Sequence, residues 1–227
     1  MKHTLTTLCL GLALVLAPPA SAALSHRPTA TGVDVTARYM TRDFSPLLIP
    51  RTPILGFAGA NYQRLHVVFL SISPDPTVAG QYIVTGFTLY KGRQTPFTGT
   101  LTTQKIDRLK AWHTGTDDEM KGRVRDEGAL FATYSFREAD GAKLIGTMEL
   151  DWYVDTHGRL VYDDIDGASD GYCNNQYTGT WTLPSGTVTA NFGEYRIPQS
   201  GDLDNGAAEF HAAAKYAAYG WPPEPTN

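Results

Sequence analysis

An acidic run with glycine bends, in the last third of the chain, has side chains that could bind a hard cation. Residues 163–171 read DDIDGASDG, in which Asp164, Asp166 and Asp170 could converge on one ion. Calcium takes several oxygen ligands, and acidic loops with glycine bends supply them. The spacing is not that of the EF-hand loop, and Asp-Gly pairs are also common in turns. The run therefore predicts a surface turn, with a Ca²⁺ site at these three aspartates as the alternative.

Acid–base and nucleophile chemistry is harder to find in the sequence. The histidines are scattered, and the chain contains no HExxH motif, GxSxG elbow, phosphate-binding loop or dinucleotide fingerprint. His113 shares a charged segment with residues 117–119, DDE, so a metal or acid–base cluster is an alternative there. His66 falls in a strand-like run, where we expect a structural role. The sequence favours a binding or interaction protein over an enzyme and leaves the question open.

Aromatic side chains are the remaining candidates for ligand binding. The chain has 12 Tyr, 4 Trp and 9 Phe, most of them in strand-like runs. Tyrosine and tryptophan join an apolar ring to a polar atom, so they suit either a filled core or a barrel lined for a ligand. The residues expected to line such a ligand site are Tyr82, Tyr90, Tyr134, Trp152 and Trp181. The alternative is that they fill the core.

Runs rich in β-branched and aromatic residues predict the strands that position these side chains. The predicted strands are 65–70, 81–91, 95–106, 129–137, 144–153, 159–163, 176–183 and 187–192. Short connections rich in Gly, Pro and Asp predict hairpins between several of them. The predicted fold is mainly β: an antiparallel barrel or bent sandwich, lipocalin-like or calycin-like, with about eight strands. A barrel of this size is filled by side chains or holds one small ligand.

Three segments fall outside the strand pattern, namely residues 23–60, 107–128 and 207–219. Residues 23–60 contain four prolines and predict an irregular surface arm, ordered in part by Phe44, Leu47, Leu48 and Ile54. The charged segment 107–128 predicts a short helical turn followed by an exposed loop.

The alanine-rich segment 207–219 predicts one C-terminal α-helix. The polar run 200–206 would cap its start, Gly220 would cap its end, and two prolines follow. Residues 61–227 are therefore expected to form a single β-rich domain that ends in a helix.

The N-terminus has the three parts of a secretory signal. Lys2 is followed by an apolar run, 5–17, and by the small residues Ala20-Ser21-Ala22. We expect residues 1–22 to be removed after Ala22, which places the protein in the periplasm or outside the cell. The alternative is an uncleaved anchor. No second long apolar run predicts a transmembrane segment in the remainder of the chain.

Cleavage would leave one cysteine, Cys173, because Cys9 lies in the signal. We interpret Cys173 as a buried free thiol, with a bridge to a partner chain or a nucleophile as alternatives. The net charge is −4, from 19 basic and 23 acidic residues in no long block. Nucleic acid is excluded as a partner, because binding phosphates needs a basic surface.

Several short runs follow one another towards the C-terminus: CNNQYTGTW at 173–181, GEYRIP at 193–198, SGDLD at 200–204, GAAEF at 206–210 and YGW at 219–221. In this order they resemble a group of uncharacterised secreted bacterial proteins, a resemblance that implies no activity. The Gly-Thr-Trp run at 179–181 also resembles a motif on strands of lipocalin-like barrels.

Two functions are compatible with these features. The first is an exported, soluble binding module that holds a small apolar or amphipathic ligand in the mouth of the barrel. The alternative is an extracytoplasmic protein-interaction factor, such as an inhibitor or an envelope-assembly protein. It would use the arm 23–60 and the loop 107–128 to contact another envelope protein. The cofactor is unknown, with Ca²⁺ as the one candidate.

Overall fold

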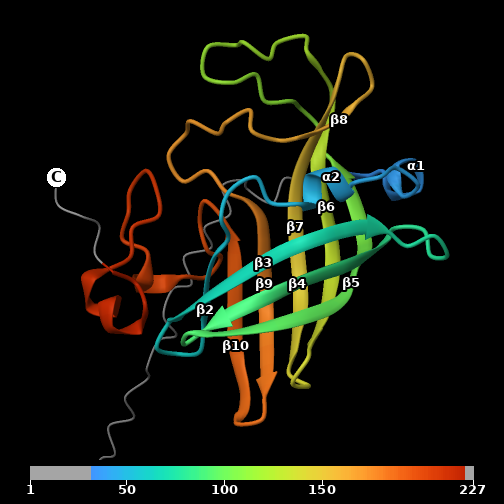
Figure 1. Ribbon diagram of the computed structural model, residues 1–227. Coiled ribbons are helices and arrows are strands. Elements are labelled where there is room, and N and C mark those ends of the chain that lie inside the picture. Colours follow the sequence, from blue (N-terminus) through green and yellow to red (C-terminus); the bar gives the residue numbers. More distant parts are fainter. Residues whose placement is uncertain (1–31, 223–227) are drawn as a thin grey trace, which may run out of the picture.

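The computed structural model describes residues 32–222, and all structural statements below refer to this part of the chain (Figure 1). The predicted signal peptide, 1–22, and the start of the arm lie outside it. The strands are β1 (Val33–Asp34), β2 (Leu55–Ala58), β3 (Gln63–Pro74), β4 (Gln81–Tyr90), β5 (Arg93–Arg108), β6 (Val124–Glu138), β7 (Lys143–Asp155), β8 (Leu160–Tyr162), β9 (Asn174–Leu183) and β10 (Gly186–Glu194). The helices are α1 (Thr36–Tyr39), α2 (Ser45–Leu48) and the 3-10 helices η1 (Gly201–Leu203) and η2 (Ala214–Tyr219).

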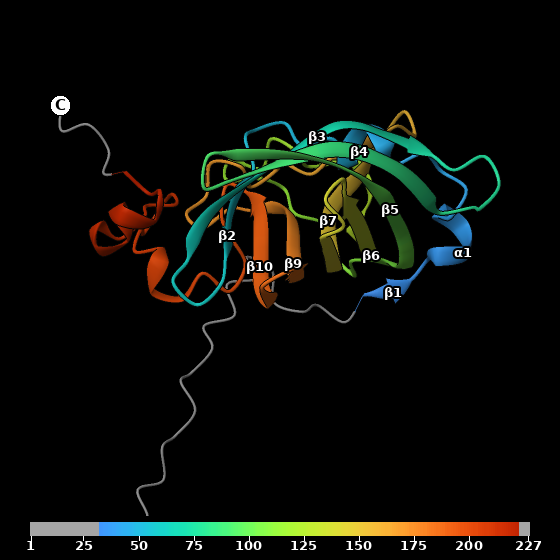
Figure 2. The same ribbon diagram turned by 60° about the horizontal axis from the view of Figure 1, so that its bottom comes forward.

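Eight of the strands close into an antiparallel barrel. Their hydrogen-bonded order is β5-β4-β3-β2-β10-β9-β7-β6, and β6 pairs back with β5. β1 extends the edge of β5, and β8 pairs with β7. In Figure 2, β3, β4 and β5 curve over one side of the barrel and the other ring strands stand beneath them. The mainly β, antiparallel barrel prediction is confirmed.

The hairpins follow from local turn chemistry. The turn between β4 and β5 consists of Lys91 and Gly92, whose φ angles are 49° and 78°. Two successive left-handed residues form the turn whose twist matches that of the flanking strands. The predicted connections between β6 and β7 and between β9 and β10 also form hairpins.

The interior of the barrel is packed with side chains. Phe97 and Phe136 are stacked with their ring centroids 4.9 Å apart, and Tyr177 and Phe192 are stacked at 4.5 Å. Tyr134 lies between these pairs, 5.0 Å from Phe136. Inward-facing aliphatic residues of the ring strands complete the same buried cluster. The barrel core therefore consists of the side chains themselves, as the second interpretation of the aromatic residues predicted.

The arm closes one end of the barrel. Tyr39 at the end of α1 and Phe44 just before α2 contact the buried Trp152, with ring centroids 4.7 Å and 5.9 Å away. The backbone N–H of Phe44 also donates to the hydroxyl of Tyr82, at 3.1 Å. The predicted irregular surface arm therefore differs from the structure. Its apolar residues enter the mouth of the barrel, and residues 55–58 form a ring strand.

The predicted α-helix over 207–219 is wrong. The segment from Tyr195 to residue 222, called the C-terminal segment below, is mostly irregular and contains only the short 3-10 helices η1 and η2. Arg196 binds the carbonyl groups of Gly206 and Ala207, and an isolated β-bridge joins Asp204 to Ala212. These tertiary contacts engage backbone groups that an α-helix would need for its own hydrogen bonds. Among the described residues, no helix is long and apolar enough to span a membrane.

Candidate functional site

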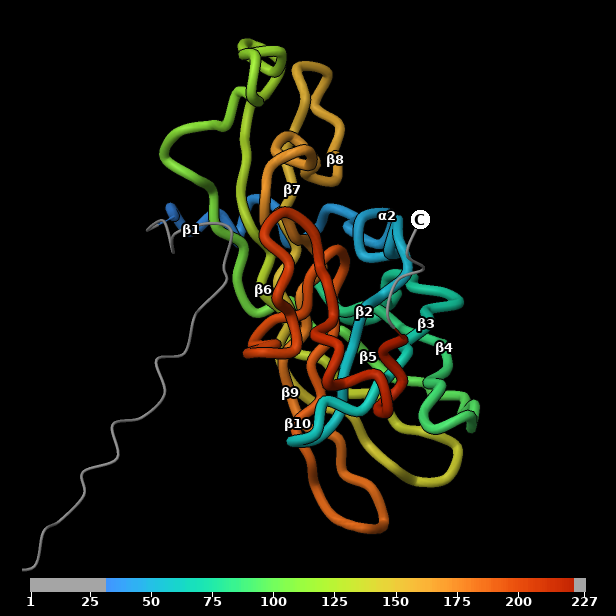
Figure 3. Tube along the Cα trace, turned by 90° about the vertical axis from the view of Figure 1, so that its left-hand side faces the viewer, coloured from blue at the N-terminus to red at the C-terminus, as the bar shows by residue number. Residues whose placement is uncertain are grey.

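The C-terminal segment covers the outer face of β2 and β3. Phe57 of β2 is buried there against Ile197, Leu203 and Trp221, in a small hydrophobic cluster separate from the barrel core. Seen from the side, the segment lies along the outside of the ring next to β2 (Figure 3). The C-terminal segment thus forms a second layer on the barrel wall, and this small hydrophobic cluster lies between the two layers.

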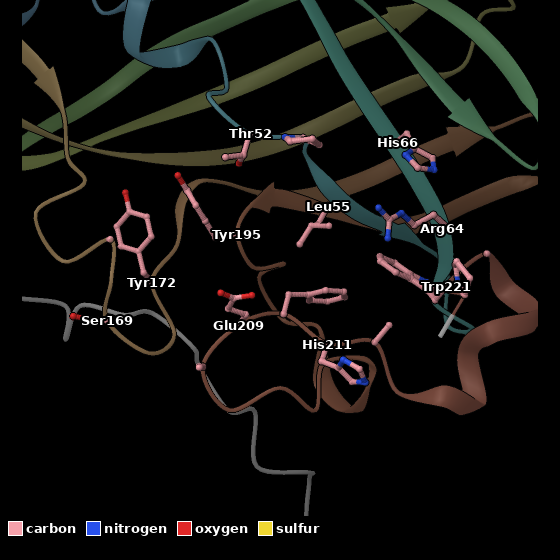
Figure 4. Close-up of a pocket in the computed structure, with 17 residues that line it drawn as sticks. Thr52, Leu55, Arg64, His66, Ser169, Tyr172, Tyr195, Glu209, His211 and Trp221 are labelled. Carbon is pink, nitrogen blue, oxygen red and sulfur yellow. The ribbon is translucent and has the colours of Figure 1, made fainter. Parts of the chain in front are cut away.

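A pocket of about 800 Å³ lies at the edge of this contact. Its walls come from the end of the arm, from β2 and β3, from the loop after β8 and from the C-terminal segment, beginning with Tyr195. The apolar lining includes Leu55, Tyr172, Tyr195, Phe210 and Trp221. The polar lining includes Arg64, His66, Glu209 and His211, and Figure 4 shows these side chains around the pocket. The pocket is therefore mainly apolar, with a few polar groups at defined places.

Arg196 holds the C-terminal wall of the pocket in place. Its Nη1 lies 2.7 Å from the carboxylate of Asp204 and donates to the carbonyl of Gly206 at 3.0 Å, and its Nη2 donates to the carbonyl of Ala207 at 2.9 Å. The two charged side chains are only 7 % and 1 % exposed. A buried ion pair with further hydrogen bonds fixes the chain just before residues 208–212, which line the pocket.

Glu194 holds the opposite wall. This carboxylate is fully buried and accepts hydrogen bonds from the backbone N–H groups of Arg51 and Thr52, at 2.7 and 2.8 Å. The hydroxyl of Tyr162 and the side-chain amide of Asn175 also donate to it, at 2.9 and 2.8 Å. A buried carboxylate is tolerated when donors surround it in this way. It ties the arm to β10 where Thr52 enters the pocket wall.

The loop 163–172 closes a third side. The N–H of Gly171 donates to the carbonyl of Ala208 at 3.0 Å, which joins the loop to the C-terminal segment. The rings of Tyr172 and Tyr195 meet edge to face, with centroids 4.8 Å apart. Burial raises the pKa of the Tyr172 hydroxyl, so both rings act as neutral walls at neutral pH.

Arg64 is the strongest electrostatic feature of the pocket. Its guanidinium lies 3.9 Å from the centroid of the Trp221 ring, and the indole N–H of Trp221 donates to the carbonyl of Tyr62 at 2.7 Å. The buried Nε of Arg64 has no hydrogen-bond partner among the described residues. Burial lowers the pKa of Arg64 to about 10, so the side chain remains a cation at neutral pH.

His66 follows Arg64 on the same outer face of β3, because alternate residues of a strand face the same side. Burial, and then the charge of Arg64, lower the pKa of His66 below its usual range. The imidazole is therefore neutral at physiological pH. Glu209 is the acidic side chain of the lining, and it lies away from Arg64 in Figure 4.

The five aromatic residues predicted to bind a ligand lie in or against the barrel core. Tyr82, Tyr134, Trp152 and Trp181 are buried there, and the half-buried Tyr90 packs edge to face on Trp181 at 4.9 Å. None of the five lines the 800 Å³ pocket. Tyr134 also borders a shallow depression on the outer wall beside Gly146 and Gly179.

The three aspartates predicted to bind Ca²⁺ are not brought together. Asp164 forms an ion pair with Arg51 at 3.0 Å, whereas Asp166 lies 3.8 Å from the Nε2 of His113. Among residues 32–222, no group of three or more His, Cys, Asp or Glu side chains is placed to hold a metal ion. Backbone hydrogen bonds such as Gly167 N–H to the Asp164 carbonyl make this run a series of turns, in agreement with the first interpretation.

His113 contacts carboxylates other than those next to it in the sequence. Its backbone N–H donates to Oε2 of the buried Glu127 at 2.6 Å, and its Nδ1 lies 2.5 Å from Oε1 of the same residue. Asp166 lies on the other side of the ring. His113 thus joins the charged loop to β6 and to the loop 163–172. Cys173 is buried, as predicted, and forms no disulfide with another described residue.

The sequence did not identify Arg64, His66 or Leu55 as site residues. Tyr195, Phe210 and Trp221 do lie in the short runs that carry the resemblance. Comparison of the chain with protein-family models, with curated proteins and with solved structures gives no match. The functional argument is therefore built from the geometry and chemistry of the pocket.

Proposed function

We propose that this protein is an exported binding module for a small amphipathic molecule, held in the pocket between the barrel wall and the C-terminal segment. The observation that carries this proposal is the pocket itself, with its volume of about 800 Å³ and its mainly apolar and aromatic lining. Small-molecule sites are typically clefts of about 300–1,000 Å³, lined by apolar side chains with a few polar groups that orient the ligand.

The proposed location differs from the barrel mouth that the sequence suggested. Tyr39 and Phe44 of the arm occupy that end of the barrel against Trp152, and aromatic rings fill the interior. A ligand there would have to displace packed side chains, which costs free energy. The outer pocket requires no such displacement.

Export and location outside the cytoplasm remain part of the proposal, based on the sequence of residues 1–22. The intact mass of protein purified from cells tests this part. A mass equal to that of the chain starting at Ala23 supports it, whereas a retained N-terminus contradicts it.

The pocket is tested by titrating the purified protein with N-phenyl-1-naphthylamine, a neutral apolar fluorophore. Ala208 lines the pocket, so Ala208→Trp fills part of it. Ala218 is also exposed on the C-terminal segment but outside the lining, so Ala218→Trp is the matched control. We expect saturable binding to wild type and control, and affinity at least about tenfold weaker for Ala208→Trp, as for a lost contact of 1.4 kcal/mol.

Equal affinities for the two variants would show that the fluorophore binds elsewhere. Absence of saturable binding to the wild type would contradict the proposal directly. The alternative of a protein-interaction factor has less support, because Phe44, Leu47 and Leu48 of the arm are buried in the core and are not free to contact a partner.

A further inference from the structure

Arg64 carries a charge that the protein does not neutralise. The side chain is half-buried, and its Nε is fully buried without a hydrogen-bond partner in the described part of the chain. Among the described residues, no carboxylate forms an ion pair with it. The half-buried Arg108 and the buried Arg196 each form an ion pair, with Asp126 and Asp204, and the half-buried Arg42 donates to the carbonyl of Gly158. A buried charge without a partner is costly, so Arg64 is in an unusual position.

The guanidinium of Arg64 donates no hydrogen bond among the described residues. Its Cζ lies over the ring of Trp221, 3.9 Å from the ring centroid, a distance at which a guanidinium stacks on an aromatic face. The five N–H donors of a guanidinium lie in its plane and point outward from its edge. Stacking therefore orients the group without using its donors. Such an edge matches the two oxygens of a carboxylate, phosphate or sulfate.

The charged side chains around the pocket lie at different ends, so they would orient a charged ligand. Arg64 and the neutral His66 lie on the barrel wall at one side, next to Trp221, whereas Glu209 lies on the C-terminal segment nearer to Tyr195 (Figure 4). An anionic group would be attracted to Arg64 and repelled by Glu209. The lining between them includes Leu55 and Phe210, which suits an apolar chain.

We infer that the ligand of this pocket is an anionic amphiphile, whose carboxylate, phosphate or sulfate group binds the guanidinium edge of Arg64 while its apolar part contacts Leu55 and Phe210. This inference rests on the proposed function and adds the charge and the orientation of the ligand. The competing role for Arg64 is purely structural, namely to pack on Trp221.

The test uses ligands with nearly the same apolar chain and different head groups. Decanoate, decyl phosphate, decanol and decyltrimethylammonium are each used to displace N-phenyl-1-naphthylamine from the full-length mature protein, below the concentrations at which they form micelles. A charge-assisted hydrogen bond predicts that decanoate binds at least about tenfold more tightly than decanol, and that the cation binds most weakly. Comparing decanoate with decyl phosphate distinguishes a fatty-acid-like ligand from a phosphorylated one.

Variants then assign the preference to Arg64. Arg64→Gln should weaken decanoate about tenfold or more and decanol less than about twofold. Arg64→Lys keeps the charge but lacks the planar edge, so it should retain only part of the preference. Arg137 is exposed on β6, three strands from β3 around the ring and outside the pocket lining, and Arg137→Gln is the matched control that should change neither affinity.

The outcomes separate the two proposals. If decanoate and decanol bind the wild type equally, the inference about charge is wrong while the pocket function stands. If Arg64→Gln weakens both ligands equally, Arg64 acts only by packing on Trp221, and the inference is again overturned. If neither the fluorophore nor any amphiphile binds the wild type, the proposed function fails together with it. The comparison on the wild type needs no variant, so a misfolded variant does not prevent a decision.

Discussion

Glu138 illustrates what burial does to a single carboxyl group in this protein. It is 3 % exposed, and it accepts hydrogen bonds from the hydroxyl of Thr88 and from the indole N–H of Trp181, the latter at 3.0 Å. Burial raises the pKa of the carboxyl, and the two hydrogen bonds only partly offset that effect. One of the predicted ligand-binding aromatics thus serves to hold a buried acid.

The pH dependence of stability follows from this raised pKa. In the unfolded chain the carboxyl loses its proton near about pH 4.3. The folded protein keeps the proton to higher pH. The carboxyl group therefore stabilises the folded state fully below its pKa in the unfolded chain, and this stabilisation is lost as the pH rises through its pKa in the folded protein. For each unit by which folding raises the pKa, the free energy of unfolding is lower by about 1.4 kcal/mol at neutral pH than at acidic pH.

We therefore expect Glu138→Gln to become more stable relative to wild type as the pH rises from about 4 to 7, since the variant cannot titrate at this position. Urea unfolding followed by tryptophan fluorescence gives the free energies. Glu119→Gln, at an exposed carboxylate in the charged loop, is the control for replacing a carboxyl group by an amide. If the free energies of unfolding of wild type and Glu138→Gln changed with pH in parallel, the expected effect would be contradicted.

Individual site residues were the least predictable part of the molecule. Arg64 and His66 have the outward positions of an ordinary strand, and nothing in their immediate sequence shows that Trp221 packs against Arg64. Leu55 and Tyr195 belong to segments about 140 residues apart that meet only because β2 pairs with β10. The sequence placed five aromatic residues on strands of the barrel, but strand periodicity is the same whether a barrel is filled by its own side chains or holds a ligand.

The C-terminal segment depends on one buried ion pair for its shape. Arg196→Met would leave the carboxylate of Asp204 buried without its cation, and breaking a buried pair costs about 3–5 kcal/mol. We expect residues 204–212 to exchange amide hydrogens much faster in this variant, while the strands keep their protection. Binding of N-phenyl-1-naphthylamine should weaken at the same time, because these residues form a wall of the pocket.

Hydrogen exchange read by mass spectrometry measures this effect, and Arg137→Met provides a control in which an exposed arginine is removed. Unchanged exchange at 204–212 in Arg196→Met would mean that the second hydrophobic cluster alone holds the segment.

The loop between β5 and β6 depends on His113 in a comparable way. Its hydrogen bonds to the buried Glu127 connect the loop to the barrel. His113→Ala removes the side-chain bond, and losing a hydrogen bond to a charged group costs about 1.5–3 kcal/mol. We expect trypsin to cleave after Lys121 or Arg123 about tenfold faster, if cleavage follows local opening. His157→Ala, in the exposed turn before β8, should leave these rates unchanged.

Cleavage of His113→Ala at the wild-type rate would show that other contacts hold the loop.

Strands and hairpins were the elements that could be predicted, because the period of two and the turn residues are local features. β2 could not, since it has only four residues and contains Gly56. The α-helix was mispredicted because alanine content favours a helix, whereas Arg196 engages the same backbone from outside the segment.

The barrel is closed by the pairing of the first and the last ring strands in sequence, β2 and β10. β2 starts at Leu55 and β10 ends at Glu194, and their pairing is the last junction of the ring. Glu194 adds hydrogen bonds to Arg51 and Thr52 at the same junction. The fold class was predictable from the strand pattern, but this junction was not, because sequence periodicity does not show which strands pair across long separations.

This closure has a consequence for how the chain acquires its structure in time. Until β10 has been made, β2 and β9 each keep one unpaired edge, and such edges pair readily with other chains. Contacts that join residues about 140 positions apart form slowly, because a long loop must close first. A chain that is synthesised or translocated from its N-terminus therefore keeps an open, aggregation-prone sheet until β10 is available to pair. A chaperone that binds these unpaired edges would protect the chain most at that late stage.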